Sequence, residues 1–383
     1  MLQAETPFIL LEIIYLIAVI IYCVYPVRVI LYASYILAGF KWSISSLGTF
    51  DITAYQGEYD GLKDYFDWGG ESLFGSESSF WKLIYIAKNL NISLTIFHAL
   101  EIILYLVAIS FFLKAFFPDK KANKLSLVFG FFGTGSETCF YLLRELLATS
   151  FLLFGMGFLF RQKPIKALLT AFSGLLFHSS PILYLPFFVS GMVADRFGKE
   201  GTSKKIDREK IIFLALLFVI YGFLYIAIND QTLSVSVLNL VFGEETLYVS
   251  KYEGYQSYAG EEGWRDESAF GFLTLVMLAF LLFVNVLRPW ILLKSKLWLF
   301  YTLTITLCIF RFLFELARAT WLSSRLPIDF FLQTSCLLLV LEIAGKKDQN
   351  RIILGASIVL FLLSIQRIVN GYEAHGMFVY PWQ

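Results

Sequence analysis

Long apolar stretches recur along the whole chain and constrain its fold more than any other feature. Apolar residues make up 58% of the 383 residues, and the mean hydropathy is +0.69. A stretch of about 20 apolar residues crosses a bilayer as a helix, which satisfies its backbone hydrogen bonds internally. We therefore predict an all-α polytopic membrane protein, a single transmembrane domain over residues 1–383 with twelve spans. The predicted spans are 7–25, 27–42, 92–113, 125–141, 142–160, 165–178, 180–194, 211–228, 269–287, 297–314, 328–344 and 352–369.

The spans at 165–178 and 180–194 are short, and His178–Pro181 separates them. Non-helical backbone at membrane depth is tolerated only against protein or a water-filled cavity. This break is therefore a sign of a cavity. The cysteines all lie in apolar segments and are predicted to be small packing residues rather than a disulfide set or metal cluster. They are Cys23, Cys139, Cys308 and Cys336.

Lysine and arginine are distributed unevenly between the ends of the predicted spans. If the spans alternate, 20 of the 31 lie on one side, as Arg28 and in five basic clusters. Cytoplasmic loops carry an excess of Lys and Arg. This side is therefore predicted to be the cytoplasm, with both termini facing outward. The clusters lie within 114–124, 161–166, 196–210, 288–296 and 346–351.

Two long loops, residues 43–91 and 229–268, fall on the opposite, outward side. The first has seven acidic residues against three lysines, and the second has eight against one Lys and one Arg. Both are rich in Tyr, Trp, Gly and Ser, and amphipathic helices are expected in them. No Walker motif, dinucleotide-binding glycine loop or zinc-type Cys/His spacing is present. We expect no metal, cofactor or nucleic acid, and an outward-facing function away from ATP.

Ionisable residues inside apolar spans are costly and usually mark function. Arg144 and Glu145 open the span 142–160 and are either an interfacial pair or a phosphate-binding Arg beside a carboxylate. His178 lies at the helix break, at the depth predicted for Arg144, and is either a satisfied core residue, a hydrogen-bond donor to substrate or a base. Glu12 and Glu101 are predicted to pack or pair helices.

A second charged group occupies the late part of the chain. Arg311, Glu315 and Arg318 recur at helical spacing and share one helix face, and Arg325 and Asp329 follow. One interpretation is a salt-bridge ladder that joins helices. The other is a cleft with surplus positive charge for an anionic headgroup, because the guanidinium fork binds phosphate oxygens bidentately.

The first long loop combines aromatic and acidic residues at helical spacing. A helix would align Asp51, Tyr55 and Tyr59 on one face, and Tyr252 and Tyr255 form a similar stretch in the second loop. Aromatic rings stack on pyranose rings and carboxylates accept hydroxyl protons, so both loops are candidate sugar-binding surfaces. The alternative is an amphipathic helix at the membrane interface.

Five short motifs are spread along most of the chain. They are Gly48-Thr49-Phe50-Asp51 with Tyr55, Leu143-Arg144-Glu145, Arg161-Gln162-Lys163, Phe177-His178-Ser179-Ser180-Pro181, and Arg318 with Arg325-Leu326-Pro327. With these motifs, the chain resembles the EpsG family, the Wzy-like bacterial exopolysaccharide and O-antigen polymerases. Two departures from the family pattern are a glycine-to-aspartate spacing wider by one residue and an Arg-Glu pair where Arg-Gln is frequent.

The resemblance implies a glycosyltransferase of the bacterial inner membrane that joins oligosaccharide repeat units carried on undecaprenyl diphosphate, at the outer face. Lipid-linked oligosaccharide would be both donor and acceptor, and a separate chain-length regulator is an implied partner. Arginines in a low-dielectric cleft would stabilise the diphosphate leaving group, and a carboxylate or His would take the acceptor proton. The predicted diphosphate ligands are Arg144, Arg311, Arg318 and Arg325, and the predicted base is Asp51 or Glu145, with His178 orienting it or sharing its role.

Three other functions remain open. A flippase or exporter of lipid-linked oligosaccharide would also need arginines in a cavity, but inverted repeats are not evident. A glycan ligase would share the donor chemistry of a polymerase. A membrane acyltransferase would need its catalytic His deep in the membrane or at the inner face, whereas His178 is predicted at the outer side.

Overall fold

In this computed structural model, every regular element among the described residues is an α-helix, as expected for a polytopic membrane protein. Among the described residues, three helices are long and apolar enough to cross a membrane. They are Leu94–Leu113, Leu143–Phe160 and Gln349–Gln366. The described residues are 2–45, 50–63, 78–131, 143–178, 328–344 and 348–369, with 188, 301, 304 and 308 as single positions.

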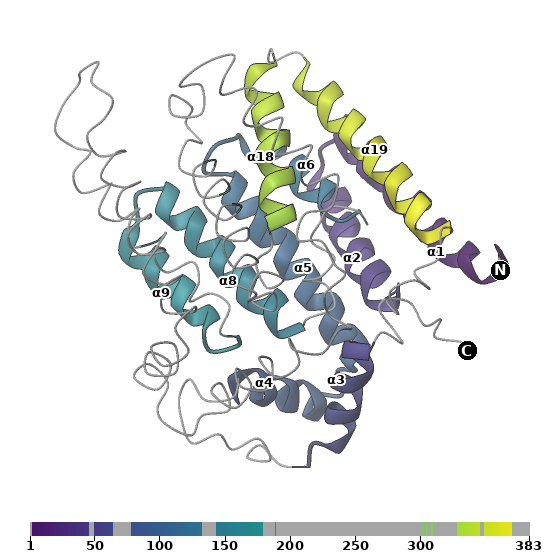
Figure 1. Cartoon of the computed structure of the whole chain (residues 1–383), viewed down its shortest axis with the longest axis vertical. Helices are drawn as coiled ribbons and strands as arrows, with labels where there is room; N and C mark the ends of the chain where they lie inside the picture. The colour runs from purple at the N-terminus through teal and green to yellow at the C-terminus, as the bar shows by residue number, and fades with distance from the viewer. Residues whose placement is uncertain are drawn as a thin grey trace, which may run out of the picture.

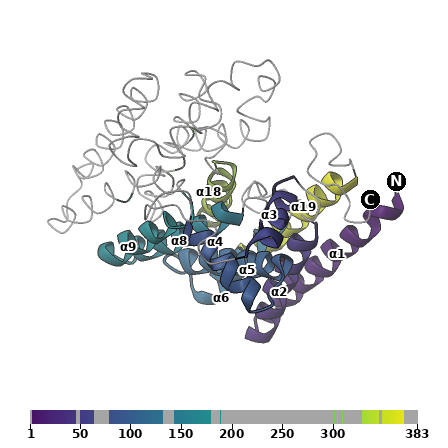
Figure 2. The same cartoon turned by 90° about the horizontal axis from the view of Figure 1, so that it is seen from below.

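Five of the described helices lie side by side in a row (Figure 1). The order across the row is α9, α8, α5, α2 and α1, with α19 packed along α1, while α18 covers one face of the row (Figure 2). Their bounds are α1 Leu2–Val24, α2 Arg28–Ser45, α5 Leu94–Leu113, α8 Leu143–Phe160, α9 Pro164–Gly174, α18 Ile328–Ile343 and α19 Gln349–Val369.

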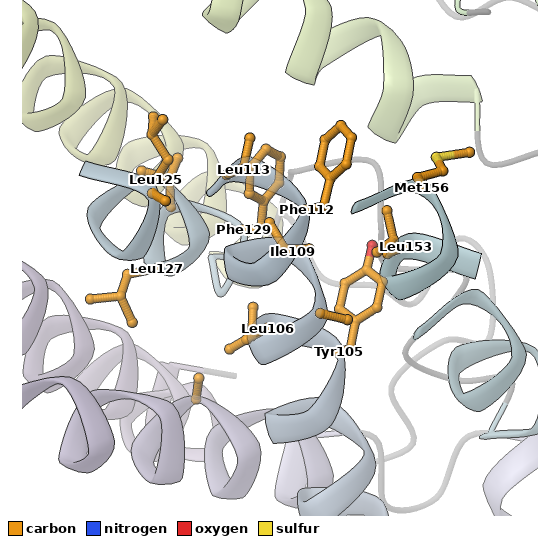
Figure 3. Close-up of a cluster of buried hydrophobic side chains, with 14 of the residues drawn as sticks. Tyr105, Leu106, Ile109, Phe112, Leu113, Leu125, Leu127, Phe129, Leu153 and Met156 are labelled. Carbon is orange, nitrogen blue, oxygen red and sulfur yellow. The ribbon is translucent and has the colours of Figure 1, made fainter. Parts of the chain in front are cut away.

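Helix α5 is central to the apolar core. Its Leu106, Ile109 and Phe112 are almost completely buried and belong to one cluster with residues of α6 (Asp119–Val128) and α8 (Figure 3). Small residues allow close helix contact, since a Cβ on Gly155 of α8 would lie 2.9 Å from the carbonyl oxygen of Ala167 in α9. Such close approach of backbones is typical of helices packed in membranes.

Most predicted spans within the described residues correspond to helices, but the described part of the span 125–141 differs, and residues 132–141 lie outside the described residues. Helix α6 begins at Asp119 and ends at Val128, so three of the lysines assigned to the preceding turn lie in the helix. Pro118 precedes the first turn and Asp119 occupies it, where a negative charge favours the helix N-terminus. These signals place the start of the helix at residue 119, although the apolar residues on which the prediction was based begin only at residue 125. The spans 180–194, 211–228, 269–287 and 297–314 lie outside the described residues, apart from the single positions named above.

Helices α5 and α8 run in the same direction. Near their ends, the Phe111 ring lies 5.3 Å from that of Phe154 and 5.0 Å from that of Phe158. Near their starts, Phe97 and Leu143 belong to one buried cluster. The shared direction agrees with the alternation that the basic clusters predict, since both helices would then run from the outer to the inner side.

The first long loop contains the predicted helix. It is α3 (Phe50–Gly61), and α4 (Ser78–Asn89) follows it and packs on α5. The ammonium of Lys88 donates to the carbonyl oxygens of Tyr59, Asp60 and Leu62 at 2.7, 2.9 and 2.8 Å. A cation at these carbonyls caps the helix and complements its dipole. Helix α3 is therefore held at the end of the row where α5 begins (Figure 1).

Candidate functional site

Arg144, in the first turn of α8, contacts Tyr55 of the loop helix α3. Its Nε donates to the Tyr55 hydroxyl at 2.9 Å, and its guanidinium carbon lies 5.5 Å from the centre of the Tyr55 ring. The contact joins residues 89 positions apart in the sequence. Two residues that were predicted separately, one for diphosphate and one for sugar, are thus brought together in one place.

Tyr55 is held by other aromatic residues of the first loop. Its ring lies 5.8 Å from that of Phe80 and 5.9 Å from that of Trp81, both in α4. With these rings, Leu143 and Leu147 of α8 form a second buried cluster, separate from the main core. Packing of this kind fixes the Tyr55 hydroxyl, because a ring wedged between neighbours cannot turn about χ1 or χ2 without displacing them.

His178 lies at the same end of the row, just beyond α9. The helix ends at Gly174, earlier than the predicted 178, and the backbone N–H of His178 donates to the Gly174 carbonyl oxygen at 3.2 Å. The preceding ring, Phe177, stacks on Phe151 of α8 at 5.4 Å with an interplanar angle of 20°. Phe151 and Phe177 pack against the cluster that contains Tyr55. The chain therefore brings His178 to the half of α8 that begins at Leu143, next to the cluster that contains Tyr55.

The two candidate bases lie in the first turns of two different helices. Glu145 is buried in the first turn of α8, 4% exposed. Asp51 lies in the first turn of α3, one helical turn before Tyr55. The carboxylate of Glu145 is close in sequence to the guanidinium that contacts Tyr55, and a negative charge in the first turn of a helix is favoured by the helix dipole.

Tyr59, the second tyrosine on α3, makes structural contacts. Its hydroxyl donates to the Ile92 carbonyl oxygen at 2.9 Å, just before α5, and the Lys88 ammonium lies 5.4 Å from the centre of its ring. Burial, followed by the charge of Asp60, raises the pKa of the Tyr59 phenol above its usual value of 10.0. The phenol therefore stays protonated at neutral pH and remains a donor to Ile92.

Five other predicted site residues lie outside the described residues. They are Arg311, Arg318 and Arg325 among the diphosphate ligands, and Tyr252 and Tyr255 among the sugar-binding residues. Within the described ranges, no group of three or more His, Cys, Asp or Glu side chains could hold a metal ion.

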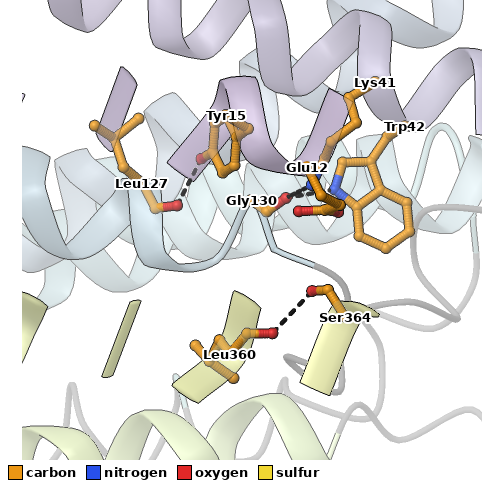
Figure 4. Close-up of polar contacts among 8 residues, drawn as sticks. All are labelled: Glu12, Tyr15, Lys41, Trp42, Leu127, Gly130, Leu360 and Ser364. Atoms are coloured by element: carbon orange, nitrogen blue, oxygen red, sulfur yellow. Dashed lines mark hydrogen bonds and ion pairs between the residues drawn. The ribbon is translucent and has the colours of Figure 1, made fainter. Parts of the chain in front are cut away.

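A buried polar network between α1, α2 and the end of α6 was not predicted as a unit (Figure 4). The Lys41 ammonium lies 2.5 Å from a carboxylate oxygen of Glu12 and donates to the Gly130 carbonyl oxygen at 2.6 Å. The Trp42 indole donates to the same carbonyl oxygen at 2.8 Å, and the Tyr15 hydroxyl donates to the Leu127 carbonyl oxygen at 2.6 Å. The prediction that Glu12 pairs helices is therefore confirmed.

This network compensates for a helix that ends among apolar segments. The last carbonyl groups of a helix lack partners within it, and an unsatisfied carbonyl in an apolar interior costs several kcal/mol. Lys41, Trp42 and Tyr15 supply the donors for the turn at Gly130, and the positive charge lies at the negative end of the helix dipole. One signal was visible in the sequence, namely one charged residue of each sign in neighbouring apolar segments.

The comparison with family models bears on the functions left open above. The model of the EpsG family matches residues 24–383, which is essentially the whole chain. The chain belongs to the EpsG family. EpsG is a Wzy-like polysaccharide polymerase family, so this EpsG-family chain is an integral membrane protein with a polysaccharide polymerase role. No curated protein and no solved structure matches it.

Proposed function

We propose that this EpsG-family protein joins undecaprenyl-diphosphate-linked oligosaccharide repeat units into a surface polysaccharide. The reaction takes place at the outer face of the bacterial inner membrane, with both termini of the chain outward. The observation that carries the proposal is the bond between Arg144 and Tyr55, which couples an intramembrane arginine to an aromatic helix of an acidic loop. The break at His178 lies at the same end of the helices.

The reaction needs positive charge at the leaving diphosphate and a proton acceptor at the incoming hydroxyl, within one cleft. The bond between the anomeric carbon of the growing chain and the oxygen of its lipid diphosphate breaks, and the diphosphate leaves with the electron pair. A guanidinium that is already oriented stabilises this developing charge without reorganisation at the moment of reaction. Arg144 meets that condition because the bond from its Nε to Tyr55 holds the plane of the guanidinium.

A hydroxyl of the new lipid-linked unit forms the new glycosidic bond and must lose its proton. Glu145 or Asp51 accepts this proton, and His178 orients the acceptor or shares that role. Direct displacement of this kind inverts the anomeric carbon. Retention of configuration in the product would contradict the single displacement.

The remaining predicted residues complete the proposal. Arg311, Arg318 and Arg325 add positive charge for the diphosphate, which carries more oxygens than one guanidinium can bind. Tyr252 and Tyr255 offer ring faces to the sugars, together with Tyr59. The ring of Tyr55 is buried, so Tyr55 takes part through its hydroxyl, which holds Arg144. A separate chain-length regulator is the proposed protein partner.

The test compares chain extension by wild-type protein and three variants purified in the same detergent. The substrate is a synthetic undecaprenyl-diphosphate repeat unit. We expect Arg144→Gln and His178→Ala to lower kcat by at least about tenfold while the fold is retained. The matched control is Arg351→Gln, since Arg351 is 87% exposed at the opposite end of the row and should extend chains like wild type. Unchanged extension by Arg144→Gln would refute the proposed site.

A further inference from the structure

Helix α5 carries a polar line of three buried side chains that the proposed reaction does not yet use. His98, Glu101 and Tyr105 recur at helical spacing and are 1%, 3% and 0% exposed. The exposed line of the same helix runs through Ile96 and Leu100, on another face. The polar line is therefore turned toward the interior of the protein and away from lipid.

The two carboxyl oxygens of Glu101 are both buried, and neither has a hydrogen-bond partner among the residues that the structure describes. This distinguishes Glu101 from Glu12, which binds Lys41 at 2.5 Å. Glu101 was predicted to pack or pair helices, but it forms no such pair with a described residue. A buried carboxyl group without a partner lowers stability, and such groups in native proteins call for an explanation.

The helix register places Glu101 level with the candidate site. Phe111 of α5 packs between Phe154 and Phe158 of α8, and the two helices run in the same direction. From these rings, the same number of residues back along each helix leads to Glu101 on α5 and to the residues next to Glu145 on α8. A difference of one or two residues is a rise of about 1.5–3 Å along the axis.

The polar line and Glu145 also face the same side of the α5–α8 pair. One turn further along α5, the Tyr105 ring points toward Leu153 of α8 within the core (Figure 3). Glu145 recurs with Met156 on α8 at helical spacing, and Met156 belongs to that core too. The face of α5 that carries Glu101 and the face of α8 that carries Glu145 therefore border one interior region, at the end of the row where Arg144 meets the loop helix.

We propose that Glu101 is a substrate-binding residue whose carboxyl group accepts a hydrogen bond from a hydroxyl of the acceptor sugar. This inference rests on the proposed function. A sugar hydroxyl supplies the donor that the buried oxygens lack, and a carboxyl group fixed on a membrane helix orients it toward the reacting end of the cleft. The stability lost by burying Glu101 is recovered when substrate binds.

A structural role and a binding role predict different results for Glu101→Met. If Glu101 only fills space, Met of similar size keeps the packing, removes an unsatisfied polar group and leaves kinetics unchanged. If it binds the acceptor, the variant has an equal or higher Tm, and its KM for acceptor rises by about 5- to 100-fold with a smaller change in kcat. Glu101→Gln keeps one acceptor oxygen, so its KM for acceptor should lie between the values for wild type and for Glu101→Met.

The matched control is Ser110→Ala on the same helix, away from the site. Ser110 donates to the side chain of Asn123 at 2.5 Å, so this variant should lose stability and keep the KM for acceptor. An unchanged KM in Glu101→Met, beside a wild type that extends chains, would overturn the inference and leave the proposed function intact. A wild type that extends no chains would overturn both. A raised KM with a raised Tm would support the inference, because a packing role changes only the Tm.

Discussion

Replacing Lys41 by Met should destabilise the protein more than any exposed substitution. The side chains of Lys41 and Glu12 are 1% and 0% exposed, so water cannot replace the lost ammonium. Breaking a buried pair by removing one partner costs about 3–5 kcal/mol, because the remaining charge stays buried. The Gly130 carbonyl keeps its bond from the Trp42 indole at 2.8 Å, so the loss there is partial. We expect the free energy of unfolding to fall by about 3–5 kcal/mol.

The double variant Glu12→Leu with Lys41→Met separates the charge effect from packing. Replacing a whole buried ion pair by apolar residues of similar size is often neutral or stabilising. The double variant should therefore be more stable than Lys41→Met alone, and the difference measures the penalty of the uncompensated carboxylate. Lys120→Met is the control for loss of positive charge, since Lys120 is exposed and its substitution should change stability by less than about 0.5 kcal/mol.

The assay is reversible unfolding in mixed detergent micelles, with the free energy of unfolding measured for wild type and the three variants. A loss below about 1 kcal/mol in Lys41→Met would show that the pair is accessible to water, as surface ion pairs are. A double variant as unstable as the single one would show that the lysine acts through packing. Either result would refute the reasoning about the buried network.

Three further predictions concern the site, the turn at Gly130 and the orientation. Tyr55→Phe keeps the ring but removes the acceptor for the arginine, and should lower chain extension about tenfold with little change in Tm. Gly130→Ala should lower stability by about 1–3 kcal/mol in the same micelle assay, because a Cβ would lie 2.0 Å from the Tyr15 hydroxyl oxygen. In a variant without native cysteines, Gly57→Cys should react with an impermeant maleimide from outside, and Lys163→Cys only after permeabilisation; the reverse pattern would contradict the orientation.

The sequence was sufficient to predict the long membrane helices within the described residues. The predicted span 92–113 corresponds to α5, Leu94–Leu113, because an apolar run bounded by polar residues admits one solution in a bilayer. The sequence was insufficient to predict α6, because this helix begins in the basic cluster, where the lysines indicate a loop, and ends at Val128. Counting apolar residues predicts the position of a helix that crosses the whole membrane. It does not predict the position of a short helix that ends inside the protein.

The candidate site was predicted as single residues and not as an arrangement. Arg144 and Tyr55 were both identified, but their contact depends on how the loop helices α3 and α4 pack at the start of α5 and α8, which local sequence does not encode. Glu101 was predicted to pack or pair helices, and the sequence alone does not show whether its carboxyl group has a partner. Its missing hydrogen bonds become evident only when the surrounding helices are in place.

The most direct test of the central claim follows the lipid and the glycan in one sample. Purified protein in proteoliposomes receives an undecaprenyl-diphosphate repeat unit, and free undecaprenyl diphosphate and glycan length are measured together over time. We predict that one lipid diphosphate is released for each repeat unit added, and that release is lost in Arg144→Gln. Movement of the intact lipid-linked unit across the bilayer, without chain growth or release, would contradict the account and indicate a transporter.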